Sequence, residues 1–404
     1  MKDCVFSITI FWSTLFFSLM SLLGKRYGGS SFSGIYVYLS VGVALLGILL
    51  VLRDFFKNAY LTLSEFVSCL ILFLFILIGV FTGYYSSSMF GQFVLFCIPS
   101  AMVALYYARR NSVSSIVKWI DVWMLVLSAS FFIKIPALVS NVMNQTAWYS
   151  QAMSYDAACA ILLNLYMMVF GKQYVRFNFF NSSFYKTARW FLLLLQFVAL
   201  ILGGGRGAIV VVIVGVICLM PTLRKQIHQG FFVFFVAVLF LIVGFYFVYQ
   251  KGDNSFTYVL DKNLTRSFSM LDDSKTMYER TSGRNYVYSN SIDAIVKSPF
   301  IGYGLFRYVE EIRPQPYPHN ILLEWALQYG ILFAIVCLFF VFVLIHKYNI
   351  GRKRNNQLAI LTPMMVVSFV QLLFSGSYMQ TPLFWFVILF LFNYKPSIQN
   401  NSYS

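Results

Sequence analysis

The chain has 404 residues, of which 59% are hydrophobic and only 11% are charged. A soluble domain carries about a quarter charged residues, so this composition excludes a water-soluble fold. The formal net charge of +16 would suggest nucleic-acid binding in a soluble protein, but the positions of the basic residues favour another explanation, given below.

Apolar runs recur along the whole chain, and each is long enough to cross a hydrocarbon core of about 30 Å as a helix. The sequence therefore predicts an all-α integral membrane protein with about twelve transmembrane helices, at residues 5–23, 33–52, 61–83, 91–107, 116–138, 156–171, 189–204, 207–221, 231–250, 320–345, 358–376 and 380–394. The first run lacks a small-residue cleavage site and is followed by further spans, so we expect a membrane helix there rather than a signal peptide.

The domain organisation follows from one long hydrophilic stretch between the ninth and tenth predicted spans. Residues 1–250 hold the first nine helices, residues 251–318 form the large loop, and residues 319–404 hold the last three helices and a tail. We find no internal repeat of the kind that is common in secondary transporters.

The basic residues predict the orientation of the chain. The termini and loops on one predicted side hold 17 Lys and Arg residues, whereas the short loops on the other side hold only Lys25, Arg26 and Arg206. Cytoplasmic loops retain Lys and Arg, so we expect both termini in the cytoplasm and the 251–318 loop in the periplasm. Most of the net charge is thereby explained, and no nucleic-acid partner is expected.

No metal site is expected. Five of the six cysteines fall inside apolar runs, and Cys4 begins the first one, so there is neither a disulfide framework nor metal-ligand spacing. Asp272 and Asp273 form an adjacent acidic pair, but in a loop of mixed charge such a pair is usually solvated.

The first candidate for binding chemistry is Arg206, in the segment Gly203-Gly204-Gly205-Arg206-Gly207. The glycines allow a tight turn or a close approach to a ligand, and the arginine would begin a helix whose N-terminal amides favour an anion. The alternative is an ordinary glycine-rich turn whose arginine extends to lipid headgroups.

The large loop supplies further arginines, Arg266, Arg280 and Arg284. Guanidinium groups bind phosphate through paired hydrogen bonds better than lysine does, although each arginine taken singly could be a solvated loop charge. Further along, residues 298–304 combine a turn with two glycines, which predicts backbone packed tightly near the membrane surface.

The segment before the tenth predicted span contains the candidate base, His319. Prolines at 314, 316 and 318 stiffen the approach, so the histidine would lie at the N-terminal rim of a helix whose positive end keeps the imidazole neutral. The alternative is a capping or interfacial histidine. A polar stripe is predicted after the histidine, because polar residues recur at a spacing of four, at Asn320, Glu324 and Gln328. Such a stripe marks either a cavity or a helix contact, and Asn320 and Glu324 are candidate substrate-binding residues.

At these residues the sequence resembles the O-antigen ligase and polymerase superfamily of bacterial envelope enzymes. The resemblance covers about residues 190–345 and has three parts, which are Arg206-Gly207, the segment from Ser282-Gly283-Arg284 through Ala294, Pro299, Gly302 and Gly304, and His319-Asn320 with Leu323 and Gly330.

Members of the superfamily move sugar chains from undecaprenyl diphosphate to a hydroxyl acceptor, at the periplasmic face of the inner membrane and without a nucleotide sugar or metal. The resemblance implies that Arg206 and Arg284 hold the diphosphate, that Arg266 and Arg280 assist, and that His319 is the general base. The implied partners are a lipid-linked oligosaccharide, membrane lipids and a protein that regulates chain length; no cofactor is implied.

The polymerase branch extends one lipid-linked chain onto a lipid-linked repeat unit, and the ligase branch transfers the finished chain to a lipid A core. Val210 and Ile321 depart from the pattern expected of ligases, which favours a polymerase in lipopolysaccharide biosynthesis, with a ligase as the alternative. An alternative of another class is a flippase for lipid-linked oligosaccharides or another transporter. The near absence of charge at the centres of the spans argues against a transporter.

Overall fold

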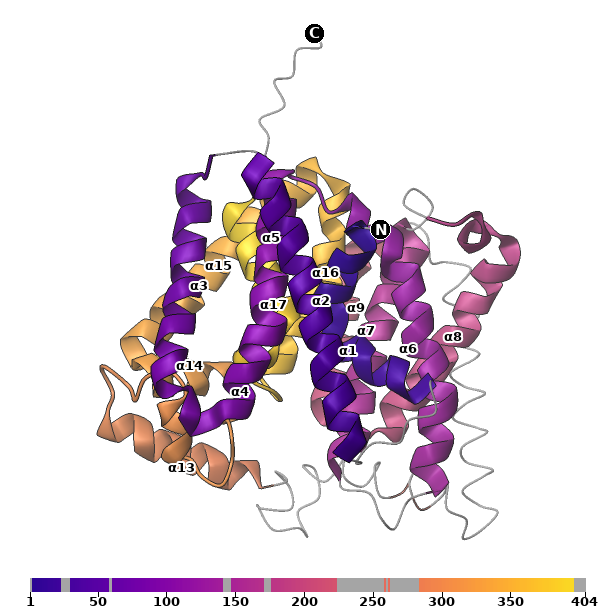
Figure 1. Cartoon of the computed structure of the whole chain (residues 1–404). Helices are drawn as coiled ribbons and strands as arrows, with labels where there is room; N and C mark the ends of the chain where they lie inside the picture. Colours follow the sequence, from indigo (N-terminus) through magenta and orange to yellow (C-terminus); the bar gives the residue numbers. More distant parts are fainter. Residues whose placement is uncertain are drawn as a thin grey trace. The chain divides into compact units, whose positions relative to one another are not determined.

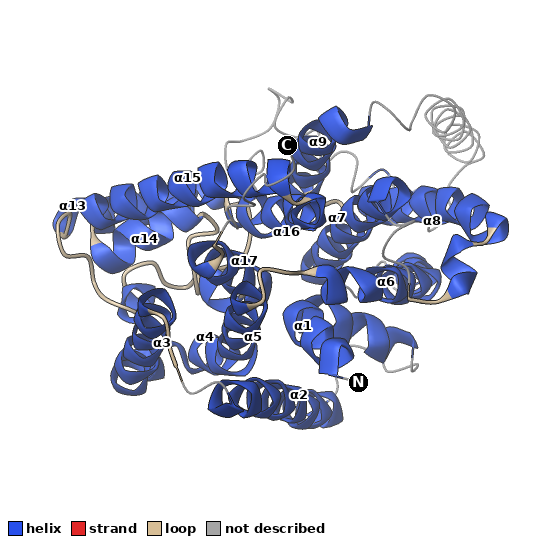
Figure 2. Ribbon diagram, turned by 90° about the horizontal axis from the view of Figure 1, so that it is seen from above, coloured by secondary structure: helices blue, strands red, loops and turns tan. Residues whose placement is uncertain are grey.

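The computed structural model describes residues 2–22, 30–57, 60–140, 147–170, 176–223, 258, 261 and 283–395. Within these ranges all regular structure is helical and no strand occurs (Figure 2). Six of the described helices are long and apolar enough to cross a membrane, and three shorter ones are also apolar. The prediction of an all-α membrane protein is therefore confirmed.

Every predicted span except 231–250, which lies outside the described ranges, overlaps one or more helices (Figure 1). The longer apolar helices are α1 (Lys2–Leu22), α2 (Ser30–Lys57), α3 (Leu63–Thr82), α5 (Ile98–Arg109), α6 (Ser114–Ser140), α7 (Ala147–Phe170), α8 (Ser183–Leu202), α9 (Arg206–Leu223), α15 (Ile331–Arg354) and α17 (Pro382–Asn393). Shorter helices include α4 (Ser87–Gln92), α13 (Arg284–Lys297), α14 (Ile321–Tyr329) and α16 (Leu361–Met365).

The chain divides into two compact units. Unit 1 comprises Met1–Ser13, Ser33–Ile116 and Tyr286–Ser404, and unit 2 comprises Thr14–Phe32 and Val117–Asn285. In unit 1, α17 packs along α5 (Figure 2), where the Ser100 hydroxyl donates to the carbonyl of Pro382 at 2.8 Å. The Trp385 ring contacts that of Phe93, with centroids 5.4 Å apart, so aromatic packing supports this helix pair.

In unit 2, α7 packs against both α8 and α9. The helices of this unit carry paired charges: Lys134 Nζ lies 2.8 Å from Asp156 Oδ2, and Arg189 Nη2 lies 2.5 Å from Asp121 Oδ1. These four residues lie toward the ends of the predicted spans 116–138, 156–171 and 189–204 rather than at their centres. Each of these charges has a partner, which offsets the cost of removing it from water.

In unit 1, loops that the distribution of basic residues assigns to the same side of the membrane lie at the same end of the unit. At one end, Asp54 Oδ1 lies 2.8 Å from Arg110 Nη2 and 3.6 Å from Lys2 Nζ, so three predicted cytoplasmic segments meet. At the other end, the Ser377 hydroxyl contacts the Met89 sulfur at 3.9 Å, which joins two predicted periplasmic segments. The loops predicted to share a side thus lie together within this unit.

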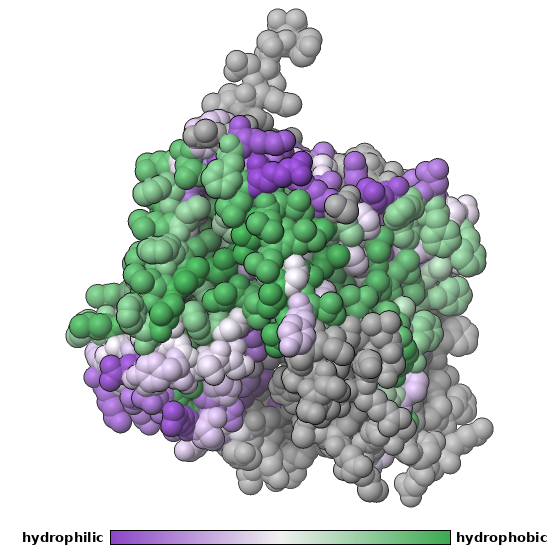
Figure 3. Space-filling view, in the orientation of Figure 1, coloured by the Kyte–Doolittle hydropathy of each residue, from purple (hydrophilic) through white to green (hydrophobic). Residues whose placement is uncertain are grey.

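The outer surface of unit 1 between these ends is apolar. On α3 the exposed side chains include Phe66, Phe73 and Phe81, and the surface over this helix is hydrophobic in Figure 3. A soluble protein would not expose apolar side chains along a whole helix, so this is the surface that faces lipid.

The tenth predicted span, 320–345, is not one helix. α14 ends at Tyr329, and α15 begins at Ile331 after a break at Gly330, whose φ is +84°. A Cβ at Gly330 would lie 2.2 Å from the carbonyl oxygen of Phe300, so the break depends on backbone that packs against this glycine. The polar stripe therefore belongs to a short helix that precedes the spanning helix α15.

Candidate functional site

The Arg206 segment of unit 2 is the turn that joins α8 to α9. α8 ends at Leu202, Gly204 has a φ of +64°, and α9 begins at Arg206, whose side chain is half-buried. A positive φ costs a glycine little, because glycine has no Cβ. The predictions that the glycines form a tight turn and that the arginine begins a helix are confirmed.

Ser154 on α7 fixes this turn in place. Its hydroxyl accepts the amide of Gly205 at 3.0 Å and donates to the carbonyl of Leu200 at 3.0 Å. A Cβ at Gly205 would lie 2.8 Å from the Cβ of Ser154, so only glycine allows this approach. The start of α9, where Arg206 lies, is thereby held against α7. Sequence reasoning missed Ser154, since nothing in its local pattern connects it to a turn about 50 residues later.

The second arginine, Arg284, is the first residue of α13 and follows Gly283, whose φ is +76°. Its side chain is half-buried. Arg266 and Arg280 lie in the part of the loop that the structure does not describe, as do Asp272 and Asp273. The phosphate-binding roles of the four arginines stay predictions.

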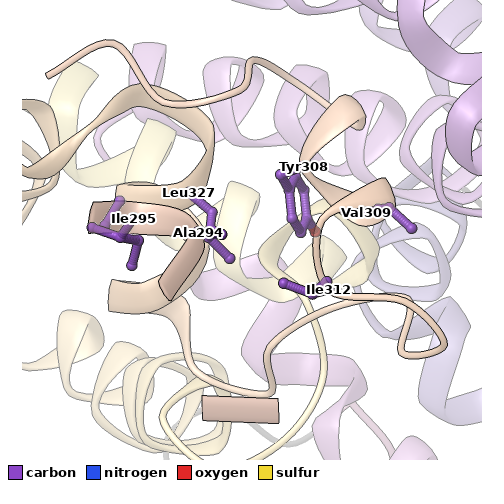
Figure 4. Close-up of a cluster of buried hydrophobic side chains, with 7 residues drawn as sticks. Ala294, Ile295, Tyr308, Val309, Ile312 and Leu327 are labelled. Carbon is purple, nitrogen blue, oxygen red and sulfur yellow. The ribbon is translucent and has the colours of Figure 1, made fainter. Parts of the chain in front are cut away.

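A small hydrophobic core anchors α13 from Tyr286 onward in unit 1, whereas Arg284 and Asn285 are assigned to unit 2. Figure 4 shows side chains from α13, from the segment that follows it and from α14 gathered into one cluster; its buried members are Ala294, Ile295, Tyr308, Val309, Ile312, Ala326 and Leu327. Within unit 1 the cluster ties the later turns of α13 to α14.

The glycine-rich turn at 298–304 docks on the C-terminal end of α14. The amide of Tyr303 donates to the carbonyl of Leu327 at 2.7 Å, and that of Gly304 donates to Gln328 at 2.9 Å. These bonds satisfy carbonyl groups that a helix end leaves unpaired. A Cβ at Gly302 would lie 2.6 Å from the backbone of Gln328, which confirms the predicted tight packing.

His319 lies directly before the N-terminus of α14. Asn320 caps this helix, and its side-chain oxygen accepts the amides of Leu322 at 2.9 Å and Leu323 at 3.3 Å. The His319 side chain is half-buried and contacts Tyr317 edge to face, with centroids 4.6 Å apart. The histidine thus lies at the helix rim, as predicted.

The backbone of His319 is strained. Its φ is +57°, and a non-glycine residue in this region costs about 1 kcal/mol or more, so the surrounding structure must hold it there. Such residues cluster at functional sites. The nearest support is the capping role of Asn320, whose amide also donates to the carbonyl of Leu373 at 3.4 Å.

Glu324 and Gln328 are fully buried. Glu324 accepts hydrogen bonds from the hydroxyl groups of Tyr308, at 2.9 Å, and Ser377, and Gln328 accepts one from Tyr378. Burial raises the pKa of Glu324 to about 7, although the bonds from Ser377 and Tyr308 oppose this rise.

The polar stripe of α14 therefore makes contacts within the protein. It connects the helix to the turn η6 (Arg307–Glu310) and to the turn η9 (Tyr378–Gln380). Sequence reasoning did not find Tyr308, Ser377 and Tyr378, because they belong to other segments; the only signal was that they are polar residues near predicted periplasmic ends. Substrate binding by Asn320 and Glu324 stays a prediction.

Comparison with known proteins identifies one domain. Residues 191–339 match the family model described as O-antigen ligase, and no curated protein matches the chain. The matched segment contains every candidate residue, namely Arg206, Arg266, Arg280, Arg284, His319, Asn320 and Glu324. The match confirms the resemblance drawn from the sequence and supports a membrane function like that of the O-antigen ligases and polymerases.

Proposed function

Because residues 191–339 match the family model described as O-antigen ligase, we propose that this chain is an O-antigen polymerase. It would be a metal-independent glycosyltransferase of the bacterial inner membrane that moves a growing polysaccharide from undecaprenyl diphosphate to a lipid-linked repeat unit at the periplasmic face. The observation that carries the proposal is His319, a half-buried imidazole whose backbone is held in a strained conformation directly before the cap of a helix in the matched segment.

In the proposed reaction His319 is the general base. The acceptor hydroxyl oxygen forms a bond to the anomeric carbon of the donor chain, and the bond from that carbon to the diphosphate oxygen breaks. Undecaprenyl diphosphate leaves with the electron pair, the hydroxyl proton passes to the imidazole, and the anomeric centre inverts. A positioned base of this kind contributes about 10²- to 10⁴-fold in rate.

Arg206 and Arg284 would bind the diphosphate, with Arg266 and Arg280 as further candidates. Negative charge grows on the leaving group as the bond breaks, so fixed guanidinium groups stabilise the transition state. Arg206 suits this role because Ser154 and Gly205 hold the start of α9 rigidly, which lowers the reorganisation needed at the moment of reaction.

The choice of a polymerase over a ligase rests on two positions. Ile321, two places after the histidine, is only 3% exposed, so this position offers no polar group to an acceptor. Val210, four places after Arg206, lies in the first turns of α9. Both residues depart from the pattern expected of ligases, although the description of the matched family model names O-antigen ligases.

The proposal is tested by the surface polysaccharide of cells with and without this gene. We expect a ladder of long chains with the intact gene and a single repeat unit on lipid A core without it. Arg284→Ala should lose the ladder and Arg206→Lys should impair it, whereas the control Arg307→Ala, at an exposed site, should keep it. If the gene restores the joining of preformed polymer to lipid A core but not chain lengthening, the protein is a ligase.

A further inference from the structure

The predicted periplasmic loop carries an exposed apolar patch. Four of its large side chains are mostly exposed, with Ile292 at 52%, Val296 at 71%, Phe300 at 72% and Ile301 at 82%. We call these four residues the apolar rim. Scattered apolar side chains are normal on a surface, but a contiguous group on a hydrophilic loop marks a surface that something covers.

The faces of α13 suggest what covers it. At 100° per residue the helix has three adjacent sectors. The sector that faces the protein core holds Val287, Ser291, Ala294 and Ile295; the exposed apolar sector holds Ile292 and Val296; the exposed polar sector holds Tyr286, Ser289, Asp293 and Lys297. A helix in the plane of a membrane surface needs such an arrangement, because it meets protein, lipid and water at once.

The apolar rim adjoins the end of a spanning helix. The amide of Ile331, the first residue of α15, donates to the carbonyl of Pro299 at 2.7 Å, and the Phe300 backbone lies against Gly330. The following turns of α15 expose the apolar side chains Leu332, Ile335, Val336 and Phe339. Since lipid covers the exposed face of a spanning helix, the rim continues a surface that already faces the bilayer.

The orientation of α13 agrees with this position. Figure 1 shows α13 running crosswise to α3 near one end of that helix, in the same unit. In Figure 3 the hydrophobic surface over α3 gives way to hydrophilic atoms in this region. The core shown in Figure 4 holds α13 in this direction.

We propose that α13 and the turn after it form a membrane-interface segment, with the apolar rim inserted among the lipids of the adjoining leaflet and the polar sector facing water. This placement of α13 at the membrane surface does not depend on the enzymatic activity. One consequence rests on the proposed function: because Arg284 begins α13, an in-plane helix holds that residue at the depth of lipid headgroups, where the diphosphate of a lipid-linked donor lies.

The test is photocrosslinking of the intact protein in phospholipid nanodiscs. The photoreactive residue p-benzoylphenylalanine is placed at Val296 or Ile301 in the rim, at Asp293 or Lys297 on the polar sector of the same helix, and at Phe339 as the lipid-facing reference. After irradiation, mass spectrometry measures the fraction of protein joined to phospholipid. We expect about tenfold more lipid adduct at the rim than at the polar sector, and a rim yield close to that at Phe339.

Two results would overturn the proposal. Equal, low lipid yields at the rim and at Asp293 and Lys297, alongside a high yield at Phe339, would put the rim in water. Crosslinks from the rim to a second copy of the chain would make it a protein interface. Val296 lies on α13 and Ile301 on the turn after it. If the variant at one of these positions fails to fold, the variant at the other still tests the proposal. The readout does not measure polysaccharide, so its failure is distinct from failure of the proposed function.

Discussion

At the scale of single residues, three features of His319 bear on its proposed role as a base. It is half-buried, it lies at the rim of a helix, and its backbone is held in a conformation with a φ of +57°. The neighbouring cap Asn320 and the preceding Pro318 restrict the backbone on either side of His319, so adjacent residues fix its place at the start of α14.

His319→Ala should abolish chain lengthening, with a loss of at least about 100-fold, because the hydroxyl proton then has no acceptor. The measurement is the polysaccharide ladder at matched levels of inserted protein. His346→Ala is the matched control, since that histidine lies on the exposed face of α15. Long chains made by the His319 variant would remove this residue from the mechanism.

Gly205→Ala should disrupt the turn before Arg206. The new methyl group would lie 2.8 Å from the Cβ of Ser154, and forcing extra volume into a packed site costs about 1–3 kcal/mol. We expect a lower melting temperature in detergent and shorter chains in cells. Gly42→Ala is the control, because nothing lies within 4 Å of a Cβ there. Equal melting temperatures for the two variants would show that the turn is not tightly packed.

At the scale of elements, the helix α14 positions the candidate residues of unit 1. Its N-terminus follows His319, its buried side chains bind the turns η6 and η9, and its C-terminus receives the 298–304 turn. Because the contacts of α14 fix where its N-terminus lies, a substitution inside this helix should shift the position of His319.

Glu324 makes the stability of this element depend on pH. Its pKa of about 7 lies above the usual 4.5, so the folded protein holds a proton that the unfolded chain releases between these values. The stabilisation is present below pH 4.5 and is lost as pH rises through 7, by up to about 3 kcal/mol. We expect the melting temperature to fall from pH 5 to pH 8.

Glu324→Gln should remove most of this pH dependence, because an amide does not titrate. Glu310→Gln is the matched control, since that carboxylate is exposed and pairs only with Arg313, at 3.5 Å, among the described residues. A wild-type melting temperature that does not change across this pH range would contradict the assignment of a proton to buried Glu324.

At the scale of the whole molecule, the distribution of basic residues predicts which side each loop faces. Alkaline phosphatase, which is active only in the periplasm, should be active when fused after Glu311 and inactive when fused after Asn355. A fluorescent protein fused after Lys395 should fluoresce, as it does in the cytoplasm. The opposite pattern would reverse the orientation and place His319 on the wrong side for a periplasmic donor.

Much of this architecture follows from sequence alone. The helical membrane fold depends on the length and polarity of apolar runs, and the turn before Arg206 and the position of His319 depend on nearby glycines, prolines and a capping asparagine. These are local effects, so one segment at a time is enough to predict them.

Only the tertiary structure decided which distant groups meet. The break at Gly330 is made by the backbone of Phe300, the carboxyl group of Glu324 is bound by Tyr308 and Ser377, and the charge of Lys134 is paired with Asp156. In each case the partner lies on another segment of the chain, at no fixed spacing in sequence. Burial makes such groups costly unless a partner is brought to them, and only the packing of the helices supplies it.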